Sequence, residues 1–237
     1  GLLAWGGWGP EQGVFAAGEA LVGTLLTAIV AVAWALPVAI MSAVFIQGLT
    51  SKLWRRRLVW VVDLLSLTPG VVFGLWGMRV LAPFGGGGER GGLGTVGGLL
   101  GLMILPLMIS LMNRFFEAAP PPLKRSALAL GASRWEATRG VLLPQGLHGV
   151  VGAVFLGLGR AVGETVAVAL VLACAPVGAH ADGSRLTTLA TVLVYELPRA
   201  MDESHINALM ALGLLLLAVS LLINGVGQLL VNWAAKG

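Results

Sequence analysis

The sequence predicts an all-α protein that crosses a membrane several times. Its 237 residues are 57% hydrophobic and 11% charged, with a mean hydropathy of +0.90, far from the composition of a soluble globular domain. Five segments approach the roughly 20 apolar residues that a helix needs to cross a bilayer. The loops between them alternate in basic content, which is typical of a polytopic membrane protein.

The predicted spans run at about residues 18–48, 58–81, 93–112, 149–176 and 206–233. The first is longer than a span needs, so one of its ends is expected to tilt or to lie at the interface. The second contains Asp63 and is interrupted by the Pro69–Gly70 pair. We treat the whole chain as a single transmembrane domain, and we expect a further helix upstream of Gly1.

Basic residues indicate which side is cytoplasmic. Most of the 15 Lys and Arg residues follow the first, third and fifth spans, and the positive-inside rule places these loops, including the long loop at 113–148, in the cytoplasm. The glycine-rich run 85–94 then lies outside, and it lacks the residue order of a phosphate-binding loop. The external stretch 186–201, LTTLATVLVYELPRAM, is expected to form a helix along the membrane surface.

The composition also excludes several kinds of site. The net charge of +4 comes from basic residues between apolar spans rather than from one basic face, so we expect no nucleic-acid partner. The single cysteine, Cys174, can form neither an internal disulfide nor a thiolate cluster. No His, Cys or acidic residues stand at metal-ligand spacing, and no nucleophile and base occur together, so we predict neither a metal site nor catalytic residues.

The cytoplasmic stretch 124–144, KRSALALGASRWEATRGVLLP, predicts two short helices joined by a turn. Ser126–Leu130 forms a helix readily, and Gly131 permits a sharp turn. Ser133 can cap a second helix that begins at Arg134, with Glu136 in its first turn.

This helix pair has two interpretations that the pattern does not separate. It could be a protruding knob that inserts into a groove of a partner, or an amphipathic loop on the lipid headgroups with Trp135 as an interface anchor. The apolar side chains in question are Ala127, Leu128, Leu130, Trp135 and Val141.

Two charges interrupt the fourth predicted span, in LGLGRAVGETVAVALVLA at residues 156–173. Arg160 and Glu164 are four positions apart, so they would lie about 40° apart on one helical face. Small residues share that stripe and would let a neighbouring helix approach closely; they are Gly149, Gly152, Ala153, Gly157 and Gly163.

A charge at the centre of a bilayer costs roughly 3 kcal/mol or more, so the charged face is expected to point into a bundle or a wet pathway. The planar guanidinium of Arg160 suits an oxyanion. The alternative is an Arg160–Glu164 pair that merely neutralises both charges, although Arg before Glu is the weaker order at this spacing.

Both motifs resemble those of ABC importer permeases. Gly131, followed by nine residues and then Val141-Leu142-Leu143-Pro144, is similar to the cytoplasmic coupling-loop signature, although Arg125 and Ser126 stand where a glutamate and an alanine are expected. The stretch GLGRAVGETVAV, residues 157–168, resembles the signature of phosphate-specific ABC importer permeases, an Arg-Ala-x-Gly-Glu-Thr core. The matching positions are Arg160, Ala161, Gly163, Glu164 and Thr165.

The likeness covers nearly the whole chain, because residues 68–77 and 205–224 also resemble segments of that family. Of the two paralogous permeases in such importers, the chain looks more like the first (PstC-type) than the second (PstA-type). The resemblance implies a MetI-like, type I ABC importer helical bundle with cytoplasmic coupling helices, located as a multi-pass protein in a bacterial-type cytoplasmic (inner) membrane.

The resemblance also implies partners and roles. The partners would be the paralogous permease, two ATPase subunits that bind ATP and Mg²⁺, an extracytoplasmic phosphate-binding protein and the lipid bilayer. The chain itself would be a transport subunit, not an enzyme, without a cofactor of its own. Substrate translocation would involve Arg160, Glu164 and Thr165. Coupling to the ATPase would involve Ala127, Gly131, Ala132, Ser133, Trp135 and Glu136.

Other functions stay open from the residues alone. A permease of the same kind could carry sulfate, molybdate or tungstate instead. A secondary transporter or channel could use Arg160 and Glu164 as an ion relay. A purely structural membrane subunit would need neither charge.

Overall fold

The computed structural model describes residues 5, 8–9, 14–81, 92–118, 121–173 and 186–234. The predicted all-α class is confirmed, since the strands within these ranges are only β1 (Trp8–Gly9) and β2 (Val14–Phe15), which pair antiparallel. Cys174 and most of the glycine-rich run lie outside the described residues.

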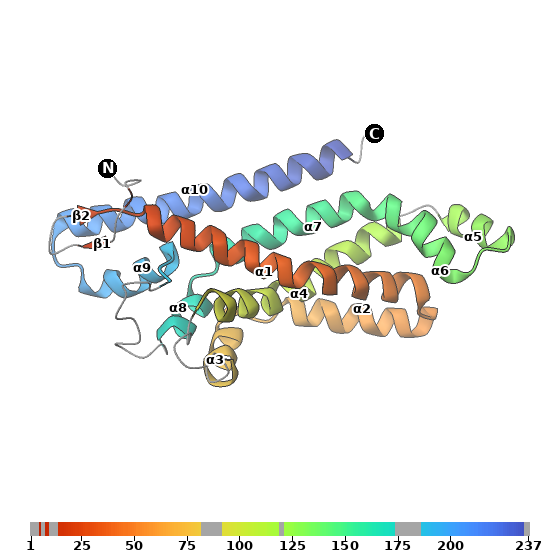
Figure 1. Ribbon diagram of the computed structural model, residues 1–237, viewed down its shortest axis with the longest axis horizontal. Helices are drawn as coiled ribbons and strands as arrows, with labels where there is room; N and C mark the ends of the chain where they lie inside the picture. The colour runs from red at the N-terminus through yellow and green to blue at the C-terminus, as the bar shows by residue number, and fades with distance from the viewer. Residues whose placement is uncertain are drawn as a thin grey trace.

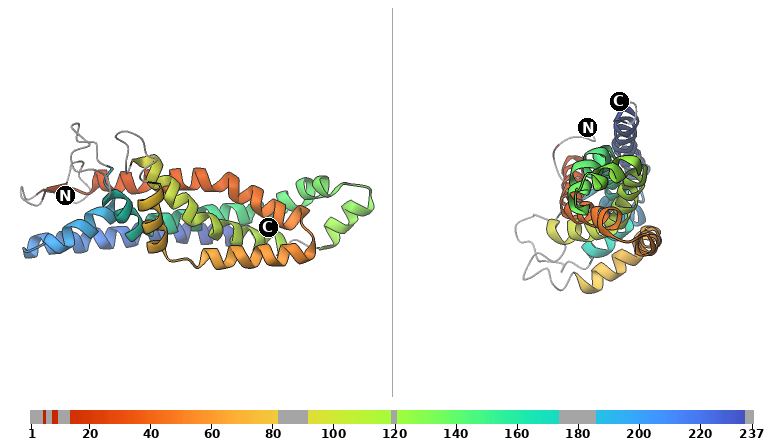
Figure 2. Two further views of the ribbon diagram at one scale, coloured as in Figure 1. Left: turned by 90° about the horizontal axis from the view of Figure 1, so that it is seen from below. Right: turned by 90° about the vertical axis from the view of Figure 1, so that its right-hand side faces the viewer.

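Four long helices run along the long axis of the molecule (Figure 1), and the end-on view in Figure 2 shows them gathered into a bundle. They are α1 (Gly18–Val44), α4 (Leu93–Ala118), α7 (Leu143–Gly163) and α10 (Glu203–Ala234). Short helices α5 (Pro121–Ala129) and α6 (Arg134–Ala137) lie at one end, and β1, β2 and α9 (Leu189–Glu196) lie at the other. The positive-inside rule makes the α5–α6 end cytoplasmic.

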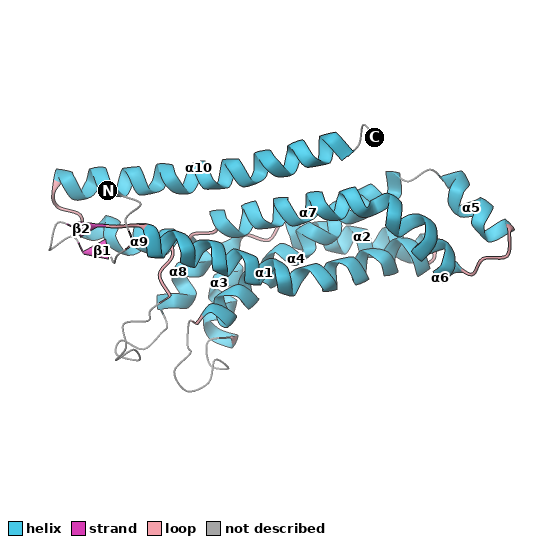
Figure 3. Ribbon diagram, turned by 45° about the horizontal axis from the view of Figure 1, so that its top comes forward, coloured by secondary structure: helices cyan, strands magenta, loops and turns pink. Residues whose placement is uncertain are grey.

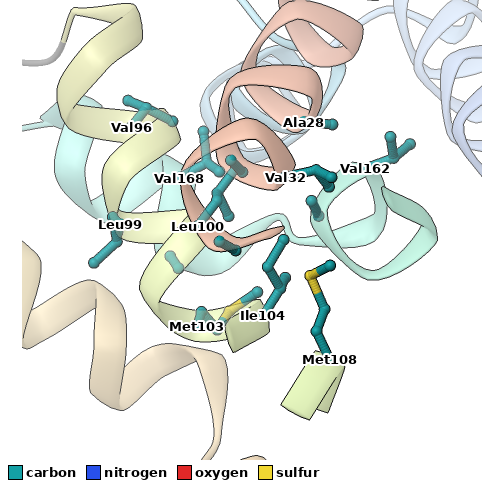
Figure 4. Packing of buried hydrophobic residues seen from close by; sticks show 14 of the residues in the cluster. Ala28, Val32, Val96, Leu99, Leu100, Met103, Ile104, Met108, Val162 and Val168 are labelled. Atoms are coloured by element: carbon teal, nitrogen blue, oxygen red, sulfur yellow. The ribbon is translucent and has the colours of Figure 1, made fainter. Parts of the chain in front are cut away.

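The core lies where α1, α4 and α7 meet. Helix α1 contributes buried alanines that recur every three or four residues and therefore share one face; they are Ala28, Ala31, Ala35 and Ala39. Helix α4 supplies large buried side chains, and Figure 4 shows Leu100, Ile104 and Met108 beside Val32 of α1 and Val162 of α7. Small residues on one helix thus receive large ones from the next.

The helices long and apolar enough to cross a membrane, among the residues described, are Gly18–Leu49, Leu93–Ala118, Arg134–Gly163 and Glu203–Asn232. They match four of the five predicted spans, with corrected bounds. The first ends in a π-helical turn, η2 (Phe45–Leu49), and the third continues past 112 to Ala118. The fourth begins well before 149, because α6 passes through a second π-helical turn, η4 (Thr138–Leu142), into α7.

The second predicted span is a bent pair of helices. Helix α2 (Lys52–Ser66) runs along the bundle, and α3 (Gly70–Val80) turns away from it by 86°, across the long axis (Figure 2). The interruption predicted at Pro69–Gly70 is therefore present, because proline disfavours helical backbone in the residue before it. The charged residue of this span, Asp63, accepts a hydrogen bond of 2.5 Å from Ser110 Oγ, which holds α2 to α4.

A helix forms in the predicted external stretch, α9, and it packs against the outer end of the bundle, while its position along the membrane surface stays a prediction. Its first residues are buried in the outer end of the bundle, where the Leu189 N–H donates to Thr24 Oγ1 of α1 at 2.9 Å. The Tyr195 hydroxyl donates to the Ala169 carbonyl of α8 (Val166–Ala173) at 2.7 Å. These hydrogen bonds and the apolar first turn draw α9 inward.

Candidate functional site

The fourth predicted span breaks at its charged residues. Helix α7 ends at Gly163, Glu164 has extended backbone (φ −79°, ψ 110°), and α8 begins at Val166. The prediction that Arg160 and Glu164 share one face of a continuous helix is therefore wrong. At the break, the Glu164 carboxylate accepts the backbone N–H of Ala167 at 3.2 Å and so satisfies a donor in the first turn of the new helix.

The break in this span lies against the break in the second span. A Cβ on Gly70, the first residue of α3, would lie 2.6 Å from Glu164 Oε2 and 2.7 Å from its Cδ. A Cβ on Gly74 would lie 2.8 Å from the Ala167 Cα of α8. Figure 3 shows α3 and α8 next to each other on the same side of the bundle. The Glu164 carboxylate thus sits where the first turns of two half-helices meet.

Arg160, in the last turn of α7, lies in the interior part of the bundle. Its Nε atom is buried without a hydrogen-bond partner, and no ion pair to Arg160 occurs in the described part of the chain. A Cβ on the neighbouring Gly159 would lie 2.5 Å from the Asn224 Cγ of α10. No ion pair therefore joins Arg160 to Glu164 in the described residues.

The predicted stripe of small residues on α7 packs against two neighbouring helices, α4 and α10. A Cβ on Gly157 would lie 3.2 Å from Met108 Sδ of α4, and one on Gly149 would lie 2.6 Å from Phe115 Cδ2 of the same helix. Gly152 and Gly163 face α10 instead, opposite Val231 and Ser220. The close helix packing expected from these residues is confirmed.

Thr165, the third predicted translocation residue, lies in the same break. Its backbone is non-helical, its side chain is half-buried, and its carbonyl accepts the N–H of Ala169 at 3.1 Å, which starts the hydrogen-bond ladder of α8. The structure brings Glu164 and Thr165 together at the break, one turn beyond Arg160.

The cytoplasmic end carries the predicted pair of short helices. Gly131 follows α5 with a φ of +92°, and two hydrogen bonds close the turn, from Gly131 N–H to the Leu128 carbonyl and from Ala132 N–H to the Ala127 carbonyl, both 3.1 Å. This pattern is a Schellman motif, which needs a left-handed residue just after the helix. Gly131, Ala127 and Ala132 therefore define the turn.

The second short helix has the predicted cap. The Ser133 hydroxyl accepts the Glu136 N–H at 3.2 Å, and the Glu136 carboxylate accepts the Ser133 N–H at 2.8 Å, which is a capping box. Leu130 and Trp135 are 89% and 51% exposed. The loop thus presents two apolar side chains from a rigid turn, as a surface for binding a partner would.

Sequence reasoning missed two features of the site. Nothing local connects Gly70 to Glu164, because the contact depends on how two bent spans pack. For the polar residues of the last helix, Gln228 donates to Asn232 within α10 at 3.5 Å, whereas Asn224 lies against Gly159 beside Arg160. A polar residue in an otherwise apolar span is the sequence signal that could have pointed to Asn224.

A family model described as "Binding-protein-dependent transport system inner membrane component" matches residues 13–236. The chain is 33% identical to the phosphate transport system permease protein PstC of Mesorhizobium japonicum, over 93% of this chain and 75% of that protein. It is 31% identical to PstC of Haemophilus influenzae, over 95% and 78%, and 34% identical to PstC 1 of Mycobacterium tuberculosis, over 91% and 72%.

Among solved structures, the chain is similar to a chain of the MetNI methionine ABC transporter in an inward facing conformation. The TM-score is 0.65 at 22% identity, and the match covers 92% of this chain and 94% of that one. This likeness confirms the MetI-like fold that the resemblance implied.

Proposed function

The chain belongs to the binding-protein-dependent transport system inner membrane components, and within them to the PstC-type permeases, and we propose that it carries inorganic phosphate across the cytoplasmic membrane. It is a multi-pass transport subunit rather than an enzyme. Its importer takes phosphate into the cytoplasm and depends on a binding protein. Membership of this family argues against the other functions considered for the sequence, namely a secondary transporter, a channel or a purely structural subunit.

The observation that carries this proposal is the state of Arg160. A buried guanidinium nitrogen without a partner is expensive inside a membrane protein, and the chain retains it next to a helix break. A phosphate oxygen can accept parallel hydrogen bonds from a guanidinium, which a lysine cannot offer in the same geometry. Arg160 would therefore contact the anion during passage, with Glu164 and Thr165 at the adjoining break.

The cytoplasmic turn between α5 and α6 would couple the permease to ATP hydrolysis. We propose that α5 and α6 dock on ATPase subunits, with Leu130 and Trp135 as the apolar contacts and Gly131 and Ser133 fixing their geometry. Helix α6 continues through η4 into α7. A displacement of this turn would therefore be transmitted along α7, which ends three residues after Arg160. ATP and Mg²⁺ would bind to those partners.

The remaining partners follow from the same assignment. We propose that the chain pairs with a paralogous permease and receives phosphate from an extracytoplasmic phosphate-binding protein at the end that carries β1, β2 and α9. Sulfate, molybdate and tungstate are also oxyanions, so the cargo is tested by competition.

The proposal is tested by initial rates of radiolabelled phosphate uptake in cells that depend on this permease. Arg160→Gln removes the charge-assisted hydrogen bonds, each worth about 1.5–3 kcal/mol, so uptake should fall roughly 10- to 100-fold. Arg160→Lys should retain part of the rate, and excess unlabelled sulfate or molybdate should not compete. Unchanged uptake by Arg160→Gln at equal membrane abundance would remove this residue from the transport path.

A further inference from the structure

Two spans of this bundle are discontinuous, and their breaks touch at one side chain. The first break separates α2 from α3 at Leu67–Pro69, and the second separates α7 from α8 at Glu164–Thr165. We propose that Glu164 is a positioning residue that holds α3 against α8 by packing on Gly70, so that the two half-helices move as one unit during transport. This inference rests on the proposed function for its consequence in uptake.

The contacts of Glu164 reach both half-helices. Its Oε1 accepts the Ala167 N–H of α8 at 3.2 Å. The same carboxyl group covers the Cα of Gly70 so closely that a Cβ there would meet Oε1, Oε2 and Cδ, the last two at 2.6 and 2.7 Å. A single carboxylate therefore lies at the first turn of each half-helix, and only a glycine leaves room for it.

Besides the contact with Glu164, α3 packs through two buried glycines and through Phe73, which lies against the core. Its buried residues are Gly74 and Gly77, which contribute close backbone packing but no side chain of their own. A Cβ on Gly74 would lie 2.8 Å from the Ala167 Cα, and one on Gly77 would lie 3.1 Å from Leu99 Cδ2. Helix α3 leaves the axis of α2 at 86°, and the contact of its first turn with Glu164 is one of those that hold it at this angle.

The electrostatics of a helix start favour this arrangement. The first four backbone N–H groups of a helix have no partner within it, and the aligned peptide dipoles place partial positive charge there. Inside a membrane such groups must find partners in the protein or in a wet cavity. The Glu164 carboxylate accepts one of these groups, the Ala167 N–H of α8, and places its negative charge beside the first turn of α3.

This role separates Glu164 from Arg160. The two charges belong to different elements, and Arg160 has no ion pair within the described residues. Removing Arg160 should weaken contact with the anion, whereas removing Glu164 should disturb the relation of α3 to α8. The two defects can be measured independently.

The first test is a double-mutant cycle in phosphate uptake with Gly70→Ala and Glu164→Ala. Each single change should lower the maximal rate about tenfold, since each disturbs the same close contact. The double variant should be no slower than Glu164→Ala alone, because the added methyl group then occupies the space of the missing carboxyl group. Independent, multiplying effects would overturn the proposal.

A matched control uses Gly77→Ala, whose methyl group would meet Leu99 of α4 rather than Glu164 or α8. Because the two sites share no partner, its defect should multiply with that of Glu164→Ala. Gly98→Ala, where a Cβ meets nothing within 4 Å, should transport at the normal rate. Glu164→Gln keeps the acceptor for Ala167 but not the charge, so it should retain more activity than Glu164→Ala.

The second test does not depend on transport. Spin labels on the exposed residues Val72 of α3 and Val166 of α8, in a Cys174→Ser background, report the distance between the half-helices in lipid nanodiscs. One narrow distribution is expected for native Glu164, and a broader or shifted one for Glu164→Ala. An unchanged distribution would overturn the inference. If Glu164→Ala changes the distance distribution but the native protein does not import phosphate, the inference is supported and the proposed function is contradicted.

Discussion

The turn between α5 and α6 offers a perturbation whose cost can be isolated. Gly131 has a φ of +92°, and a Cβ at this position would meet nothing within 4 Å. Gly131→Ala therefore causes no collision, and its whole cost is that of holding an L-residue in left-handed backbone, about 1–2 kcal/mol. If docking on the ATPase requires this turn, the dissociation constant should rise by up to about 5- to 30-fold.

The assay is titration of nanodisc-embedded permease with its ATPase subunit, followed by fluorescence or calorimetry. Gly140→Ala is the matched control, because its Cβ also meets nothing within 4 Å and its φ is not positive; this helical position should bind normally. Gly131→Asn should lie between, since asparagine tolerates left-handed backbone better than alanine. Equal affinity of Gly131→Ala and the native protein would show that docking does not require the left-handed turn at Gly131.

Two further changes test the packing of the bundle, each by thermal unfolding in detergent. Gly146→Ala should destabilise the fold by about 1–3 kcal/mol, because its methyl group would collide with the Phe116 ring. The control Gly98→Ala, where a Cβ meets nothing within 4 Å, should unfold at the native temperature. A Gly146→Ala variant as stable as the native protein would contradict the close contact between α4 and α7. Leu100→Ala should lower the free energy of unfolding by about 2–5 kcal/mol, because Leu100 is 0% exposed in the core. Leu102→Ala changes a residue of the same helix that is 42% exposed, so it should lower this free energy far less. A larger loss for Leu102→Ala than for Leu100→Ala would place the core elsewhere.

Local features of this fold could be predicted from the sequence because their causes are local. The capping box of Ser133 and Glu136 and the left-handed turn at Gly131 involve residues within a few positions of one another. Such interactions are specified by spacing alone. The cytoplasmic helix pair was therefore predicted closely, including the start of α6 at Arg134.

The geometry of the charged site could not be predicted in the same way. Helical periodicity places Arg160 and Glu164 on one face only if the helix is continuous, and this one ends at Gly163. The Glu164 carboxylate contacts Gly70 from a distant part of the chain. A contact between two bent spans leaves no spacing signal in either of them, although Pro69 did predict one of the two breaks.

Phosphate is proposed to pass through this chain along a path that includes Arg160. The most direct measurement is phosphate accumulation in proteoliposomes that contain the permease, its paralogue and the ATPase, with the binding protein outside and ATP inside. We expect accumulation that requires both ATP and the binding protein, that vanadate inhibits, and that Arg160→Gln lowers roughly 10- to 100-fold. Accumulation that persists without ATP, or that is equal in Arg160→Gln, would contradict this proposal.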